Sequence, residues 1–151
     1  MFVDLQLNCL NVCRQTQLMD HISVGKLGED LACKYLFKKG YRIIDRNYRL
    51  KIGEIDIIAI SRDKTLVFIE VKTLKSGNAA INSADEQFAG LMPEDNLTSS
   101  KLQKLSKTCE LFAGKNPQLI KEGKGWRIDL VAILLNEKNE AEFKHYENIS
   151  L

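Results

Sequence analysis

Charged side chains interrupt two neighbouring apolar segments of the sequence. Residues 53–60 read GEIDIIAI and residues 66–73 read LVFIEVKT. Their aliphatic residues predict two central strands that are covered on both sides. Burying an ionised side chain in such a strand costs free energy unless the charge is paired or bound to a metal. The charges therefore indicate a site within the predicted sheet, built from Glu54, Asp56, Glu70 and Lys72.

Strand geometry predicts which of these side chains meet. Alternate residues of a strand share a face. A three-residue turn centred on Asp63 places Asp56 opposite Glu70. The same register places Glu54 opposite Lys72, and all four side chains then share one face. A turn of two or four residues would separate the two pairs unless a bulge restored the phase.

These residue types suit the hydrolysis of a phosphodiester. That reaction requires an activated water and relief of negative charge on the phosphate, and carboxylates that hold Mg²⁺ or Mn²⁺ supply both. Asp56 and Glu70 are the candidate ligands. Lys72 is the candidate to orient or deprotonate the water, or to stabilise the phosphate. The alternative is a buried salt-bridge cluster, in which Glu54 pairs with Lys72 and Asp56 with an arginine.

Periodicity predicts the elements that must position this hairpin. Apolar residues recur at helical spacing through residues 23–39, and Gly40 follows where a left-handed C-terminal cap is expected. A second helix is expected over residues 99–113, with Lys101, Lys104 and Lys107 off its apolar stripe. Three more strands are expected over residues 41–48, 126–135 and 141–146. One long loop is expected over residues 74–97.

The chain of 151 residues suits a single domain, assigned to residues 21–151. Residues 1–20 are predicted to be an N-terminal extension, and Met19 is an alternative start. The net charge is only +2, but Lys and Arg concentrate in residues 34–51 and 101–127. Clustered basic residues can form a phosphate-facing surface. For any one of them the alternative is a solvated helix face.

Cysteine usage and hydropathy indicate a compartment. The four cysteines form no C-x-x-C pair and have no histidine at zinc-binding spacing, so a reducing cytoplasm fits. No apolar run is long enough to span a membrane, and the N-terminus lacks the pattern of a signal peptide. The expected localisation is cytoplasmic, with no membrane partner.

Motifs on both sides of the hairpin occur in an order that resembles a known family. Upstream of it lie GEDLA at 28–32 and GYRII at 40–44, and downstream lie RIDLV at 127–131 and HYENI at 145–149. Together with the hairpin they resemble the YraN-like family of bacterial proteins over roughly residues 23–150. The order of Asp56, Glu70 and Lys72 is similar to the PD-(D/E)XK signature of restriction-endonuclease-like nucleases.

The resemblance implies an α/β fold with a restriction-endonuclease-like core, a mixed central β-sheet flanked by α-helices, similar to Holliday-junction resolvases. It implies Asp56, Glu70 and Lys72 as the nuclease triad. A metal site of Asp56, Glu70 and the Val71 carbonyl follows, with Mg²⁺ or Mn²⁺ as cofactor. Glu29 matches a helix glutamate of the resolvases that contributes to the site, with a solvated helix residue as the alternative.

The expected activity is an endonuclease on DNA, on branched or damaged substrates, and a homodimer is expected by analogy. The alternatives are a nucleic-acid-binding module without turnover, and a scaffold with a structural ion cluster. Asp129 is expected either to anchor an arginine near the site or to mark the exposed face of an edge strand. Two departures are that Ile55 replaces the motif's proline and that residues 74–77 lack the arginines expected there.

Overall fold

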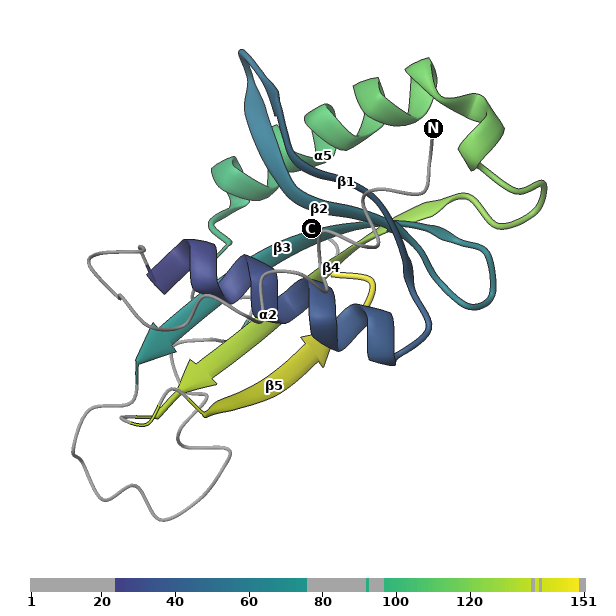
Figure 1. The fold of residues 1–151 in the computed structure, drawn as a ribbon. Coiled ribbons are helices and arrows are strands. Elements are labelled where there is room, and N and C mark those ends of the chain that lie inside the picture. The colour runs from purple at the N-terminus through teal and green to yellow at the C-terminus, as the bar shows by residue number, and fades with distance from the viewer. Residues whose placement is uncertain (1–23, 76–91, 93–96, 137, 139, 150–151) are drawn as a thin grey trace.

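The computed structural model describes residues 24–75, 92, 97–136, 138 and 140–149 (Figure 1). The predicted extension of residues 1–20 lies outside the described residues, and so does most of the predicted loop of residues 74–97. The described elements are α2 (Val24–Lys38), β1 (Arg42–Leu50), β2 (Gly53–Ile60), β3 (Leu66–Lys75), α5 (Ser99–Lys115), the 3₁₀ turn η2 (Pro117–Leu119), β4 (Trp126–Leu135) and β5 (Ala141–Tyr146).

The five strands form one sheet in the order β1-β2-β3-β4-β5. The pairs β1–β2, β2–β3 and β4–β5 are antiparallel, whereas β3 and β4 are parallel. A parallel pair needs a crossover connection, and α5 lies in the chain between these two strands. The predicted α/β class with a mixed central sheet is confirmed.

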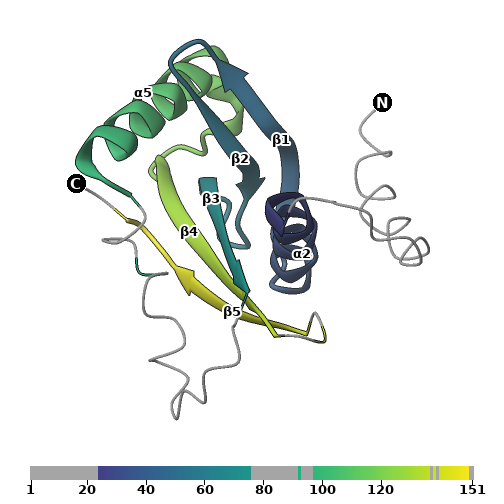
Figure 2. The ribbon, with the colours of Figure 1, turned by 90° about the vertical axis from the view of Figure 1, so that its left-hand side faces the viewer.

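The two helices cover opposite faces of the sheet (Figure 2). Side chains of Ile58, Ile60, Leu66 and Phe68 pack with α5 in one core cluster. The alternate residues of the same strands pack with α2 in a second cluster. Both helices are amphipathic, so each buries one apolar stripe against the sheet. The near-continuous apolar sequence of β2 and β3 follows from this coverage.

The first helix ends as its sequence predicts. Gly40 has a φ of 85°, in the left-handed region. Its N–H donates to the carbonyl of Phe37 at 2.9 Å, and the N–H of Tyr41 donates to the carbonyl of Leu36 at 2.9 Å. These two bonds close the C-terminus of α2 and turn the chain directly into β1. None of the helices in the described part of the chain is long and apolar enough to cross a membrane.

The regular alternation of β2 breaks near its start. Ile55 packs in the α5-side cluster together with Ile58, whereas Ile57 packs in the α2-side cluster. Residues 55 and 57 would share a face in an untwisted strand, so β2 twists sharply between them. In β1, Asn47 has a φ of 53° at the same level. Figures 1 and 2 show the outer end of the β1–β2 hairpin lying alongside α5.

Candidate active site

The turn between β2 and β3 sets the register of the site. The N–H of Ser61 donates to the carbonyl of Thr65 at 3.0 Å, and the N–H of Lys64 donates to that of Ser61 at 2.9 Å. Lys64 has a φ of 70°, which completes a type I turn followed by a left-handed residue. The predicted three-residue turn is therefore confirmed. The ladder runs from Ile60–Leu66 to Ile57–Ile69.

Beyond that ladder the two strands part. Asp56 and Glu70 are the next residues in register, and at this point the Asp56 side chain replaces the backbone as acceptor. Its Oδ2 accepts a hydrogen bond from the N–H of Val71 at 2.8 Å. β3 stays paired with β4 as far as Lys75. Asp56 thus lies in the fork between β2 and β3, directly beside the chain segment that carries Glu70 and Lys72.

The Asp56 carboxyl lies among other acidic groups. Burial, the largest cause, and the charge of Glu70 together raise its pKa to about 7. The hydrogen bond from Val71 acts in the opposite direction, while Glu29 and Glu54 add smaller repulsions. Close carboxylates repel one another until a proton or a cation neutralises them. The structure therefore brings all four predicted acidic residues within electrostatic range of one point.

Glu70 already has a cationic partner. Its side chain is only 10% exposed and forms an ion pair with the ammonium of Lys101, which is half exposed. Lys101 lies in the first turn of α5, where its N–H donates to the Thr98 hydroxyl at 3.3 Å. A lysine in that position opposes the helix dipole. A lysine at this position is a sequence signal that could assign Lys101 to the site, whereas helical periodicity predicts only that it lies off the apolar stripe.

Lys72 follows Glu70 on the same face of β3. It is half-buried and lies opposite Ala132 of β4. Within the described ranges it forms no ion pair with a carboxylate. Glu54 pairs instead with Arg49 at 3.2 Å, and both side chains are more than half exposed. The alternative of a buried Glu54–Lys72 salt bridge is therefore wrong, because the twist of β2 carries Glu54 to the rim of the hairpin.

Glu29 reaches the site from α2. Its Oε2 accepts a hydrogen bond from Asn47 Nδ2 at 2.9 Å. The Arg46 guanidinium lies 3.8 Å from the same oxygen and 2.7 Å from Oδ1 of Asp30. These contacts join α2 to β1 at the level of the twist. Glu29 is therefore an anchored, partly buried residue and not the freely solvated one of the alternative reading.

A glycine brings α2 unusually close to β3. A Cβ atom built at Gly28 would lie 1.8 Å from Oγ1 of Thr73. No larger residue fits there without moving one of the two elements. Because Gly28 precedes Glu29 and Thr73 follows Lys72, this contact sets the spacing between the helix and the strand that carry candidate site residues.

The donor set suits a hard divalent cation. No group of three or more described His, Cys, Asp or Glu side chains is arranged to hold a metal ion. Asp56 and Glu70 supply two carboxylates, and the N–H of Val71, the residue after Glu70, donates to Asp56. Mg²⁺ is commonly held by one or two carboxylates, with water and substrate phosphate as the other ligands. Structural zinc needs four protein ligands, which these residues do not provide.

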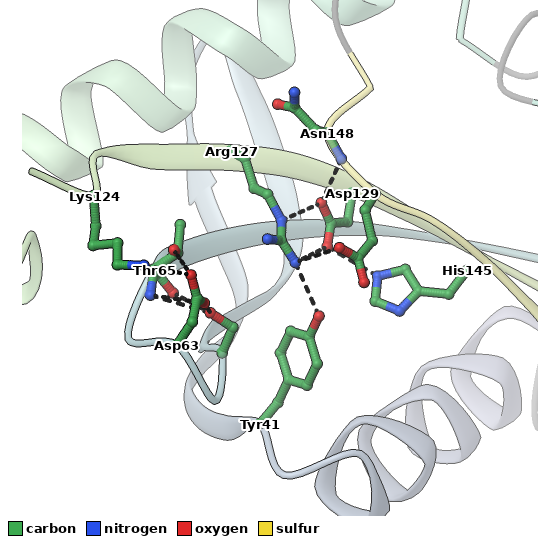
Figure 3. Close-up of polar contacts among 10 residues, drawn as sticks. Tyr41, Asp63, Thr65, Lys124, Arg127, Asp129, His145 and Asn148 are labelled. Carbon is green, nitrogen blue, oxygen red and sulfur yellow. Dashed lines mark hydrogen bonds and ion pairs between the residues drawn. The ribbon is translucent and has the colours of Figure 1, made fainter.

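A second charged cluster lies around Asp129 (Figure 3). Asp129 is fully buried and accepts from Arg127 Nε at 2.9 Å and from the N–H of Asn148 at 2.8 Å. Nε2 of His145 lies 2.9 Å from Oδ2 of Asp129. Burial opposes its ionisation, but the hydrogen bonds of His145 and Arg127 hold its pKa below the usual range. The prediction that Asp129 anchors an arginine is confirmed, but this arginine does not lie near the predicted site, because Asp129 lies in register with Ile69 on the α2 side of the sheet. The edge-strand alternative is wrong because β4 is internal.

This cluster closes the C-terminal end of the described chain onto the sheet. Arg127 also donates to the Tyr41 hydroxyl at 3.0 Å and pairs with Glu147 at 3.2 Å. The His145 ring packs edge-on against Tyr35 of α2, with 6.0 Å between ring centroids. The cluster therefore joins β4 to α2 and to the residues after β5. It lies on the α2 side of the sheet, away from Glu70.

Comparison with known proteins places the chain in a family. The model of Uncharacterised protein family UPF0102 matches residues 28–133. A UPF0102 protein of Campylobacter concisus is 39% identical over 127 residues, which covers 84% of this chain and 93% of the relative. One of Trichlorobacter lovleyi is 36% identical and covers 83% and 88%. One of Alkaliphilus oremlandii is 63% identical over a shorter segment of 54 residues, 36% of this chain and 45% of the relative.

Similarity to a solved structure is weak. The structure of Pyrococcus furiosus SfsA in complex with Ca²⁺ gives a TM-score of 0.33 at 16% identity, covering 85% of this chain and 64% of that chain. A similarity at this level carries no weight for the fold or the site. The family match covers most of α2, the hairpin, α5 and most of β4, and the expected resemblance to the YraN-like family is confirmed. The chain belongs to the UPF0102 family.

Proposed function

We propose that this protein is a divalent-metal-dependent endonuclease of the PD-(D/E)XK superfamily, with a restriction-endonuclease-like core, acting on DNA. The observation that carries the proposal is the fork between β2 and β3. There Asp56 lies beside Glu70, bound to the backbone of Val71, in a position that raises its pKa to about 7 through burial and the neighbouring charge. A fold without a ligand at this point gains nothing from two facing carboxylates.

Asp56, Glu70 and the Val71 carbonyl would hold Mg²⁺ or Mn²⁺. The bound ion supplies an acidified water and stabilises charge on the phosphate. Lys72 projects from β3 on the same face as Glu70 and has no described carboxylate partner, so its ammonium is available to the attacking water or the phosphate. Glu29, held by Asn47, adds negative charge on the α2 side and suits a position where it orients water.

Lys101 has a role that follows from its ion pair. In the described state its ammonium neutralises Glu70. A metal ligand must give up such a partner, so Lys101 would leave Glu70 if Glu70 held the cation. Its half-exposed position at the start of α5 then places the ammonium where it can bind a non-bridging phosphate oxygen. Lys101 would thus neutralise Glu70 when no cation is bound and contact the substrate phosphate when one is bound.

Cleavage assays test the proposal. Wild-type protein with Mg²⁺ or Mn²⁺ is incubated with four-way junction, flap, nicked and intact duplex DNA. Asp56→Asn, Glu70→Gln and Lys72→Met are each expected to lower the cleavage rate by about 100-fold or more. Glu110→Gln is the matched control, since Glu110 lies exposed on α5 and pairs with Lys107, away from Glu70. If Glu70→Gln cleaves as fast as the control, the assignment of the site fails.

Metal binding separates turnover from binding alone. Calorimetric titration with Mn²⁺ is expected to give one site per chain that is lost in Glu70→Gln and kept in Glu110→Gln. Retained Mn²⁺ and DNA binding without cleavage of any substrate would favour the non-catalytic nucleic-acid-binding module. Sedimentation of the protein with and without junction DNA tests the predicted homodimer in the same samples.

A further inference from the structure

A basic cavity lies at the opposite end of the β2–β3 hairpin from Asp56. Its volume is about 630 Å³. It is bounded by the hairpin turn, the start of β1 and the segment after α5, with the lining residues Gly40, Arg42, Ile60, Ser61, Arg62, Lys64, Gln118, Leu119 and Lys121. Ile60 and Leu119 belong to the α5-side core, so the floor of the cavity is part of the folded sheet.

The cavity concentrates positive charge. Arg42, Arg62, Lys64 and Lys121 line it, and no acidic side chain does. None of these four cations forms an ion pair with a carboxylate in the part of the chain that is described. Four cations of one sign that converge without counter-charge repel one another, and an anionic ligand relieves that repulsion.

The acidic residue of the turn, Asp63, does not line the cavity. Asp63 accepts hydrogen bonds from the Ser61 hydroxyl and from the Thr65 hydroxyl at 2.9 Å, and it pairs with Lys124 at 3.1 Å. These donors hold the pKa of Asp63 below its usual range. Asp63 therefore stabilises the turn and leaves the charges of Arg62 and Lys64 uncompensated.

The backbone fixes where two of the cations lie. A Cβ at Gly40 would lie 2.7 Å from Cγ of Arg62, so the stem of this arginine rests on the glycine backbone. Lys64 takes its position from the left-handed residue of the turn, with a φ of 70°. Arg62 and Lys64 thus belong to the same turn that sets the register of the candidate active site.

The lining selects for phosphate and against a base. It has guanidinium and ammonium donors, the Ser61 hydroxyl and the Gln118 amide, but no aromatic side chain on which a base could stack. A ligand that presents several phosphates without requiring base contacts is a nucleic-acid backbone. We propose that this cavity is a second binding site for the phosphate backbone of the DNA substrate, an inference that rests on the proposed nuclease function.

Two elements give the spacing between the sites. The six residues from Asp56 to Arg62 span roughly 20 Å along β2. The helix α5 carries Lys101 at the Glu70 end and is followed by Gln118 at the cavity, which gives roughly 25 Å along its axis. At about 3.4 Å per nucleotide along the duplex axis, the cavity contacts the backbone about six base pairs from the bond that is cut.

The salt dependence of DNA binding tests this proposal. Duplex and junction DNA are titrated by fluorescence anisotropy in EDTA, so that cleavage does not interfere. Arg62→Gln/Lys121→Gln is expected to lower affinity at least tenfold at low salt and to reduce the slope of log K against log salt by about two. Lys138→Gln, an exposed lysine at the β4–β5 turn, is the control for Lys121→Gln and is expected to leave the slope unchanged.

The outcomes distinguish the two proposals. The inference is overturned if the double variant keeps the wild-type slope while its melting temperature shows it folded. It is also overturned if tripolyphosphate binds at the cavity, seen as amide shifts at residues 62–64, and yet leaves the affinity for DNA unchanged. The cavity would then bind a small polyanion and not the DNA backbone. Asp56→Asn is expected to keep the wild-type slope but lose cleavage. A slope change in the double variant, together with no cleavage of any substrate by the wild-type protein, supports the cavity and refutes the nuclease.

Discussion

The carboxylate of Asp56 accepts a hydrogen bond from the backbone N–H of Val71 at 2.8 Å, where β2 and β3 separate. The Asp56 side chain therefore accepts a hydrogen bond at the point where the backbone of the next residue pair would otherwise continue the ladder. The contact also holds the Asp56 carboxylate near Glu70, whose negative charge raises the pKa of Asp56. Most of the chemistry expected of this chain depends on that placement.

Metal affinity is expected to depend on pH through Asp56. Burial and the Glu70 charge raise its pKa to about 7, so below neutral pH a metal must displace a proton. Mn²⁺ affinity should rise about tenfold per pH unit up to about pH 7 and then level off. Calorimetry between about pH 5 and pH 8, in buffers of different ionisation enthalpy, measures both affinity and proton release. An affinity that stays constant over this range would contradict the assignment.

The metal-free protein should become more stable when Asp56 is neutral. The carboxyl has an ordinary pKa of 3.8 in the unfolded chain and about 7 in the folded one. Its contribution to stability is therefore complete below about pH 4 and is lost as pH rises through about 7. Asp56→Asn should raise the free energy of unfolding by about 1–3 kcal/mol above neutral pH. Urea denaturation in EDTA checks this, and a less stable variant would refute it.

Removal of the Lys101 ammonium should have opposite effects on binding and turnover. Lys101→Met frees Glu70 from its ion pair, so Mn²⁺ affinity is expected to rise several-fold. Cleavage should fall about tenfold or more, because a phosphate contact is lost. Lys107→Met, on the same helix and paired with Glu110, is the control. Weaker Mn²⁺ binding in Lys101→Met would show that the lysine supports the site and does not compete for it.

The contact between Gly28 and Thr73 makes a stability prediction. Gly28→Ala puts a methyl group 1.8 Å from Oγ1 of Thr73, so overpacking should cost about 1–3 kcal/mol despite the better helix propensity of alanine. Gly114→Ala is the matched control in α5, where a Cβ meets nothing within 4 Å. That change should stabilise by about 0.5–1 kcal/mol. Thermal melts of the two variants should therefore shift in opposite directions.

Acid sensitivity should come from Asp129. Its hydrogen bonds from His145 and Arg127 outweigh the effect of burial and hold its pKa below the usual range. A depressed carboxyl contributes stability that is present above about pH 4 and is lost as pH falls. Asp129→Ala leaves Arg127 without its buried partner and should cost about 3–5 kcal/mol near neutral pH. The difference from wild type should shrink on acidification, and a constant difference would refute this account.

The hairpin could be predicted from the sequence because its determinants are local. The turn length follows from residues near Asp63, and the register from Ile57 to Ile69 follows from the turn. Gly40 marked the end of the first helix for a similar reason, since only its own φ and two backbone bonds are involved. In each case the information lies within a few residues of the feature.

What could not be predicted depends on contacts between distant segments. The pairing of Lys101 with Glu70 joins residues 31 positions apart and requires the packing of α5 on the sheet. The twist that puts Ile55 and Ile57 on opposite faces follows from the outer hairpin lying along α5, and strict alternation in the sequence conceals it. The cation cluster around the cavity likewise joins Arg42 to Lys121 across the fold.

The fork has a mechanical consequence. β3 remains paired with β4 through Lys75, so Glu70 and Lys72 ride on the inner sheet, whereas Asp56 rides on the outer β1–β2 hairpin. Movement of the outer β1–β2 hairpin relative to β3 would change the distance between the Asp56 and Glu70 carboxylates. It would leave the spacing of Glu70 and Lys72 unchanged, because both lie on β3. A cation bound between Asp56 and Glu70, as proposed, would link the outer hairpin to the inner sheet, and slower hydrogen exchange in the outer hairpin would report its binding.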